Sequence, residues 1–120
     1  MATVAVPIFK SRIAPVFDSC IQVLVIEIEH KRELARSKLH IENLLAFERV
    51  ATLKRAGVTT LICAGISNVL HTMLESAGIR VIPGIIGQID EVITAYVSKR
   101  LDDQRFFMPG RVGRSTNDPE

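Results

Sequence analysis

A buried strand, a glycine turn and a helix follow one another over residues 58–77, and this pattern constrains the fold most. The apolar run Val58–Ala64 has the length and the β-branched content of a buried strand. Gly65 allows a sharp bend, and Ser67 is a good N-cap for the helix that follows. A second apolar strand, Ile79–Pro83, begins where the helical spacing ends. Such a strand–helix–strand unit makes a right-handed crossover between parallel strands, so the pattern predicts an α/β fold.

Three further strands are predicted before this unit. The last two alternate apolar and polar residues around a polar turn, so they should form an antiparallel hairpin. In this hairpin Glu27 and Glu29 would lie near Arg36 and Lys38, which is a favourable pairing of opposite charges. The three predicted strands are Thr3–Ile8, Ile21–Glu29 and Leu34–Ile41, with a loop over Phe9–Asp18.

Helical spacing recurs in two more segments. One helix begins near Asn43, with an inward face made of Ala46, Phe47, Val50 and Leu53, and the last helix begins near Gln88. The order β-β-β-α-β-α-β-α predicts an α/β fold with a mixed five-stranded sheet flanked by helices, which resembles the ribonuclease-H-like arrangement. Residues 1–109 are expected to form one domain, followed by a flexible tail over residues 110–120.

The composition excludes several classes of protein. A chain of 120 residues with 48% hydrophobic and 23% charged residues is typical of a globular domain. Its formal net charge of +2 is too small for nucleic-acid binding, which needs a concentrated basic face. No apolar run reaches the length of a membrane span and no signal peptide is evident, so a cytoplasmic protein is expected. Two distant cysteines do not predict a disulfide scaffold.

The turn after the strand Val58–Ala64 is the leading candidate for a ligand site. Open α/β sheets bind ligands at the carboxyl ends of parallel strands, and the amide groups of a helix N-terminus favour anions. Gly65 and Ser67 belong to this turn. Cys63, at the exit of the strand, is either a thiolate ligand for a metal or cluster or a small buried apolar residue. Cys20 is a weaker candidate for the same edge of the sheet.

Two charged or titratable side chains are further candidates. His71 lies one helical turn after Ser67, at the border of the apolar face, and is either a ligand or a solvated helix histidine. Arg12 could reach an anion at the edge of the sheet or form an ion pair with Asp18.

A second glycine-bounded loop, Gly84–Gly87, should lie beside the first because it also follows a parallel strand. Its two isoleucines, Ile85 and Ile86, are expected to be exposed and to suit an apolar ligand or a partner surface. No pair of histidines or cysteines has the spacing of zinc ligands, so a structural zinc site is not expected.

Five short segments follow one another in a recognisable order. They are Arg12–Asp18 (RIAPVFD), Leu61–Ser67 (LICAGIS), Met73–Ile79 (MLESAGI), Val81–Gly84 (VIPG) and Arg100–Asp103 (RLDD). Their succession, over roughly residues 3–109, resembles the dinitrogenase iron–molybdenum cofactor biosynthesis family, the small nitrogenase-accessory-type domains.

The resemblance implies a ribonuclease-H-like sheet and the binding of an iron–sulfur or iron–molybdenum cluster, or its precursor, during metallocluster assembly. It implies other assembly proteins as partners. Together with the candidates above, the predicted cofactor-binding residues are Arg12, Cys63, Gly65, Ser67 and His71, with Cys63 as the metal ligand. Many family members have a glycine- and cysteine-rich tail, whereas Gly110–Glu120 contains no cysteine.

Two alternatives to a cluster carrier require different residues. A two-metal nuclease needs clustered carboxylates, including one on the first strand, and Thr3–Ile8 has none, so no enzymatic activity is expected. The other alternative is a metal-free binding module that uses the two glycine loops for a small anion or a partner protein. The cysteine-free tail favours this second alternative.

Overall fold

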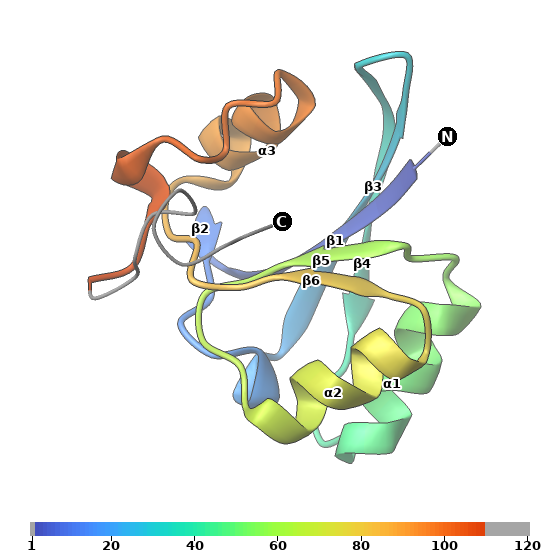
Figure 1. The fold of residues 1–120 in the computed structure, drawn as a ribbon. Helices are drawn as coiled ribbons and strands as arrows, with labels where there is room; N and C mark the ends of the chain where they lie inside the picture. Colours follow the sequence, from blue (N-terminus) through green and yellow to red (C-terminus); the bar gives the residue numbers. More distant parts are fainter. Residues whose placement is uncertain (1, 110–120) are drawn as a thin grey trace.

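The computed structural model describes residues 2–109, which form a mixed sheet with helices on both faces (Figure 1). The strands are β1 (Ala2–Phe9), β2 (Arg12–Ile13), β3 (Gln22–Glu29), β4 (Arg32–His40), β5 (Thr60–Ile62) and β6 (Arg80–Ile82). The helices are α1 (Ala46–Arg55), α2 (Asn68–Ser76) and α3 (Ile89–Val97), with short 3-10 turns η1 (Phe17–Ser19) and η2 (Gln104–Phe106). The predicted flexible tail, residues 110–120, lies outside the described residues.

The sheet has the strand order β4-β3-β1-β5-β6, and β2 pairs with β1. β1, β5 and β6 run parallel, whereas β3 and β4 are antiparallel to their neighbours, so the predicted mixed α/β sheet is confirmed. The predicted count of five strands was one short. The sixth strand, β2, lies in the segment assigned to a loop, where the chain turns back at Lys10 with a φ of 58°. A two-residue strand carries no detectable alternation of side chains.

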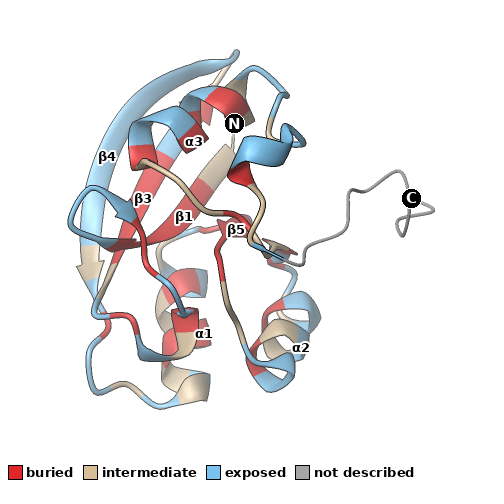
Figure 2. Cartoon of the chain, turned by 90° about the vertical axis from the view of Figure 1, so that its left-hand side faces the viewer, coloured by how far each residue is buried: buried red, intermediate tan, exposed pale blue. Residues whose placement is uncertain are grey.

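The sheet separates two apolar cores. Helices α1 and α2 cover one face and α3 covers the other, as Figure 1 shows. The central strands are buried on both faces, which explains why their sequences read as continuous apolar runs. Figure 2 shows this buried centre beside the exposed edge strand β4. No helix among residues 2–109 is long and apolar enough to cross a membrane.

The charge pairing predicted for the β3–β4 hairpin was wrong. A bulge after Glu27 shifts the register, so that Glu27 lies opposite Ala35 and Glu29 opposite Arg32. Arg36 lies opposite an apolar residue of β3 and forms ion pairs with Glu33 and with Asp90 on α3, the latter at 2.8 Å. The hairpin is therefore joined to α3 rather than closed on itself by charge.

Candidate functional site

Backbone hydrogen bonds join the segment after β2 to the loop after β5. The amide of Gly65 donates to the carbonyl of Pro15 at 2.8 Å, and the amide of Phe17 donates to the carbonyl of Gly65 at 2.8 Å. Val16 and Gly65 consequently pair like residues of parallel strands. The two segments therefore lie side by side.

The loop after β6 joins the same group. The amide of Ile13 donates to the carbonyl of Gly87 at 3.1 Å, and Arg12 pairs with Gln88 in an antiparallel bridge. The amide of Gly84 donates to the carbonyl of Ala64 at 2.9 Å. We call the three joined segments, residues 10–18, 63–67 and 83–88, the loop rim. It lies at the carboxyl ends of the parallel strands, where α/β sheets bind ligands.

Gly65 is required where the loop rim is most closely packed. A Cβ atom added at this position would lie 2.9 Å from the carbonyl oxygen of Pro15 and 3.4 Å from Cγ2 of Val16. The first distance is shorter than a normal non-bonded contact, so any side chain would push the two loops apart.

The start of α2 presents both occupied and free amide groups. Ser67 is the N-cap residue, as predicted, and its Oγ accepts a hydrogen bond from the amide of Leu70 at 3.2 Å. Three backbone amides, those of Ile66, Asn68 and Val69, make no hydrogen bond to the described part of the chain. They are the groups with which a helix N-terminus can bind an anion.

Asp18 occupies part of this anion-binding position. Its Oδ1 accepts a hydrogen bond from the amide of Ser67 at 2.9 Å, so the carboxylate lies at the positive end of the α2 dipole. The possible ion pair between Asp18 and Arg12 is not formed. Arg12 is exposed on β2 and has no ion pair with any carboxylate of residues 2–109.

His71 lies on α2, one turn beyond the loop rim. Its side chain is half-exposed, and its Nε2 lies 3.6 Å from a carboxylate oxygen of Glu75 on the same helix. The contact is an ion pair only when the imidazole is protonated. The neutral ring has one nitrogen free to accept a metal ion.

Cys63 points into the core between the sheet and helices α1 and α2. Its exposed fraction is 0%, and its neighbours in this core include Phe17 and Leu70. Burial raises the pKa of the Cys63 thiol to about 12, with smaller contributions from Asp18 and Cys20. The thiol is therefore protonated at neutral pH and out of reach of a ligand on the surface.

Cys20 lies in the same core and beside a buried arginine that the sequence analysis missed. The Nη1 atom of Arg49 donates to the carbonyls of Phe17 at 3.1 Å and Cys20 at 2.9 Å, and approaches the Cys20 Sγ at 3.6 Å. Burial raises the pKa of the Cys20 thiol, and Arg49 lowers it in part. The guanidinium thus holds the end of η1, next to the loop rim.

The pattern of α1 contained a signal for Arg49. Ala46, Val50 and Leu53 define the inward face, and Arg49 has the spacing of this face. Phe47, which was assigned to the inward face, is instead 60% exposed. The burial of this arginine is not predicted from the pattern, because charged residues are rarely buried.

The expected exposure of Ile85 was also wrong, since its side chain is only 1% exposed. The segment after α3 covers it, because the amide of Ile86 donates to the carbonyl of Phe106 at 2.7 Å and Ile85 pairs with Phe107. The periodic pattern of the sequence ends before this segment, which is too short and irregular to be detected.

The sequence of the chain matches the model of the family described as dinitrogenase iron–molybdenum cofactor over residues 1–99. The chain belongs to this family. Among curated proteins none matches the sequence.

Several solved structures share this fold. PH0822 superposes with a TM-score of 0.77 at 20% identity, covering 82% of this chain and 90% of its own. A provisionally assigned dinitrogenase from Methanocaldococcus jannaschii gives a TM-score of 0.68 at 17% identity, covering 82% and 89% of the two chains. A provisionally assigned NifB protein from Thermotoga gives a TM-score of 0.64 at 22% identity, covering 92% of this chain and 100% of its own. At these identities the likeness concerns the fold alone.

The family's name refers to a metal cofactor, so the metal-binding capacity of the site matters. Within residues 2–109 no group of three or more histidine, cysteine, aspartate or glutamate side chains could hold a metal ion. The start of α2 instead offers free amides, with the half-exposed His71 one turn further on, while the exposed Arg12 lies on another part of the loop rim, beside Gln88. This arrangement suits a preformed anionic group better than a bare cation.

Proposed function

We propose that this chain binds and carries an iron–sulfur or iron–molybdenum-type cluster, or its precursor, during metallocluster assembly, without catalysing a reaction. Membership of the iron–molybdenum cofactor family supports this cargo. The loop rim supports the mode of binding, because a preformed cluster needs few protein ligands. A carrier also benefits from weak ligation, since it has to release its cargo.

The observation that carries the proposal is the set of free amides at the start of α2. Ile66, Asn68 and Val69 offer N–H groups without partners in residues 2–109, at the positive end of the helix dipole. Arg12 adds a positive charge elsewhere on the loop rim, where β2 pairs with Gln88. An anionic cluster would displace or share the position of the Asp18 carboxylate.

The proposed metal ligands differ in how easily a cluster reaches them. His71 is half-exposed and can bind a metal through a neutral ring nitrogen. Cys63 is covered by the paired segments around Gly65, and its thiol would have to lose a proton. We therefore assign His71 to the first contact, and Cys63 to a second contact made only when the loop rim opens.

Exposed apolar residues beside the loop rim suit a partner that delivers or accepts the cluster. Val16 is 41% exposed on the loop after β2, and Val69 is 66% exposed in the first turn of α2. Burial of such side chains on association is favourable, and exposed apolar groups near a site often mark an interface. We propose that metallocluster assembly proteins contact this surface.

The test is anaerobic titration of the purified protein with isolated iron–molybdenum cofactor, followed by visible absorption and electron paramagnetic resonance. The protein should change the spectrum of the cofactor at one equivalent. His71→Ala should weaken binding at least about tenfold, and Arg12→Gln about threefold. His40→Ala, which removes an exposed histidine on β4, is the matched control. An unchanged cofactor spectrum at all ratios would refute the carrier proposal.

Metal-free binding is the second candidate, and the burial of both thiols favours it. In this case the loop rim would hold a small inorganic anion or a partner protein through its free amides and Arg12. Calorimetric titration with phosphate separates the two. Phosphate binding that Arg12→Gln weakens, without any response to the cofactor, would support this alternative.

A further inference from the structure

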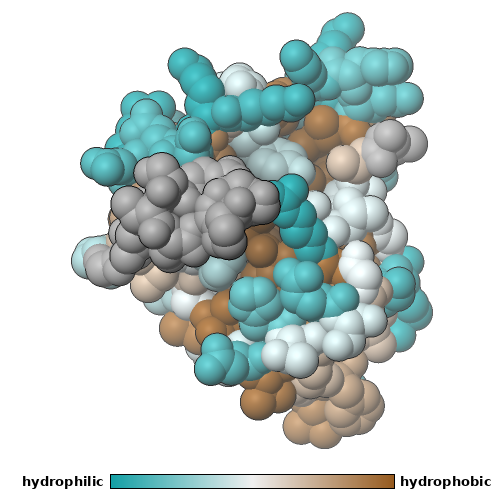
Figure 3. Space-filling model, viewed as in Figure 1, coloured by the Kyte–Doolittle hydropathy of each residue, from teal (hydrophilic) through white to brown (hydrophobic). Residues whose placement is uncertain are grey.

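A pocket of about 520 Å³ lies on the α3 face of the sheet, the face opposite Cys63. Its volume is in the range of pockets that bind small organic molecules. It is lined by residues from the start of β1, the β3–β4 hairpin, β6 and the loop after it, and α3 and the segment after it, and it shares none of its lining residues with those predicted for cofactor binding. Figure 3 shows hydrophobic surface between hydrophilic side chains on the side of the molecule that carries β6.

The interior of the pocket is apolar. Ile28, Ile82, Ile85 and Leu101 contribute aliphatic groups, and Tyr96 contributes an aromatic ring. The Tyr96 hydroxyl makes no hydrogen bond to residues 2–109 and is not fully buried, so it is available to a bound molecule. An apolar body with the size of one to three rings would fit this interior.

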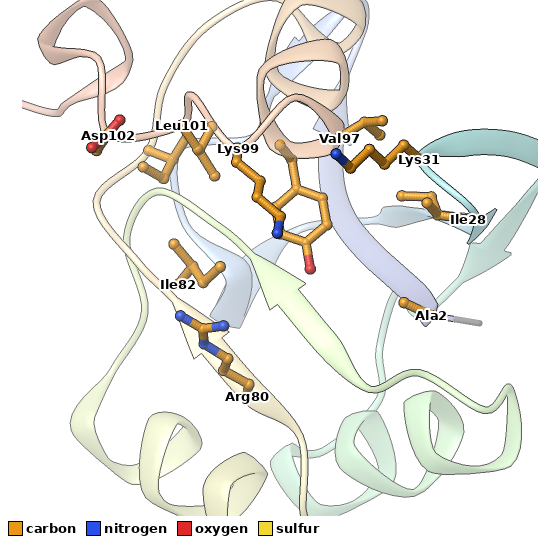
Figure 4. Close-up of a pocket in the computed structure, with 11 residues that line it drawn as sticks. Ala2, Ile28, Lys31, Arg80, Ile82, Val97, Lys99, Leu101 and Asp102 are labelled. Atoms are coloured by element: carbon orange, nitrogen blue, oxygen red, sulfur yellow. The ribbon is translucent and has the colours of Figure 1, made fainter. Parts of the chain in front are cut away.

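Positive charge surrounds this apolar interior. Lys31, Arg80 and Lys99 line the pocket together with one carboxylate, that of Asp102. In the described part of the chain none of the three cations forms an ion pair. Figure 4 shows that they come from three different elements, the hairpin, the start of β6 and the end of α3. Unpaired cations around an apolar pocket are complementary to an organic anion.

Lys99 occupies a backbone position that favours glycine. The amide of Arg100 donates to the carbonyl of Ala95 at 2.7 Å and that of Lys99 to Tyr96 at 3.1 Å, which is the Schellman pattern at the end of α3. Helices α1 and α2 end with glycine at the equivalent position, Gly57 and Gly78, with φ values of 82° and 86°. At the end of α3 the equivalent position is occupied by Lys99, with a φ of 61°.

Lys31 shows the same feature in the β3–β4 hairpin. The two-residue turn consists of His30 and Lys31, with φ values of 53° and 61°. Such a turn normally contains Asn-Gly or Asp-Gly, because both residues adopt left-handed conformations. Two of the three pocket cations are thus held at positions where a glycine would be less strained, and sites of retained strain often serve binding.

From this geometry we propose that the pocket binds a small organic anion: an apolar body of one to three rings that carries a carboxylate, sulfonate or phosphate group. The body lies against Ile82, Leu101 and Tyr96, and the anionic group lies between Lys99 and Arg80, with Lys31 at the other side. Of the pocket's lining residues only Ile85 also belongs to the loop rim, and none is among the residues proposed to bind the cluster.

The probe for this site is 1-anilinonaphthalene-8-sulfonate, compared with N-phenyl-1-naphthylamine, which has the same rings without the sulfonate. The sulfonate should bind saturably at one site, with fluorescence enhancement that weakens as salt is added. Lys99→Gln and Arg80→Gln should each weaken its binding about three- to tenfold and that of the neutral probe less than about twofold. Lys54→Gln, an exposed lysine on α1, is the control and should change neither.

The variant Lys99→Gly separates the contribution of the Lys99 side chain to anion binding from its effect on the stability of the fold. Glycine should raise the thermal stability by relieving the left-handed backbone, while sulfonate binding falls as it does in Lys99→Gln. Amide chemical shifts should change at residues 80, 82 and 99–102. The proposal is overturned if both probes bind equally, if the sulfonate binds without saturation, or if its shifts map elsewhere.

Discussion

The carboxylate of Asp18 accepts a 2.9 Å hydrogen bond from the backbone amide of Ser67, the N-cap residue of α2. One acidic side chain thereby links the segment after β2 to the start of the helix and neutralises the positive end of the helix dipole. The contact stabilises the loop rim and competes with any anionic ligand there. These two effects can be separated by substitution.

Asp18→Asn keeps an oxygen acceptor and removes the charge. We expect the free energy of unfolding to fall by about 0.5–1 kcal/mol, because the helix dipole loses its counter-charge. Binding of an anionic cluster at the loop rim should become tighter. Urea unfolding and the cofactor titration measure the two quantities. Weaker cluster binding by Asp18→Asn would indicate that the carboxylate is itself a ligand.

Gly65→Ala should destabilise the protein by about 2–3 kcal/mol. The added methyl group would lie 2.9 Å from the Pro15 carbonyl oxygen, which belongs to the backbone and cannot rotate away. Gly57→Ala is a useful comparison, because its methyl group would meet no atom within 4 Å and only the left-handed backbone would be strained. That variant should lose about 1 kcal/mol. If both variants lost the same stability in thermal unfolding, the loop rim would be able to accommodate the added methyl group by a small shift.

Arg49→Met should cost about 3 kcal/mol of stability. The substitution keeps much of the side chain's volume but leaves the Cys20 carbonyl without this donor and the Phe17 carbonyl with only the Cys20 amide at 3.3 Å. Arg55→Met, on the exposed side of the same helix, should change stability by less than about 0.5 kcal/mol. Denaturant unfolding followed by circular dichroism compares the two. A similar small effect in both would show that water satisfies the buried carbonyls.

The buried thiol of Cys63 predicts a loss of stability at alkaline pH. Its pKa is about 12 in the folded protein, against 9.0 for an exposed thiol. Between these values the unfolded chain releases a proton that the folded chain retains, so the free energy of unfolding falls as pH rises above about 9. Cys20, whose pKa is also raised, acts in the same direction. Cys63→Ala should show a shallower decline between pH 8 and 10 in urea unfolding.

The sequence predicted the parallel part of the fold because a helix with a clear apolar period lies between the two apolar strands β5 and β6, and it predicted the meeting of the glycine loops because both follow parallel strands. The direction of Cys63 was not predictable. Leu61 and Cys63 face one core while Ile62 and Ala64 face the other, so alternation along a strand buried on both sides does not distinguish the faces. The pairing of Asp18 with Ser67 depends on a contact over 49 positions of the chain, which no local pattern contains.

The buried guanidinium of Arg49 has a consequence for how the candidate site keeps its shape. Helix α1 contributes no residue to the loop rim, yet its arginine holds the backbone of η1 through two carbonyl groups. The amides around Phe17 should therefore exchange with deuterium on the timescale on which α1 opens, not on that of an exposed loop. The order of the surface that binds and releases cargo would therefore depend on α1, which lies behind it. Substitutions that destabilise α1 should reduce ligand binding before they unfold the protein.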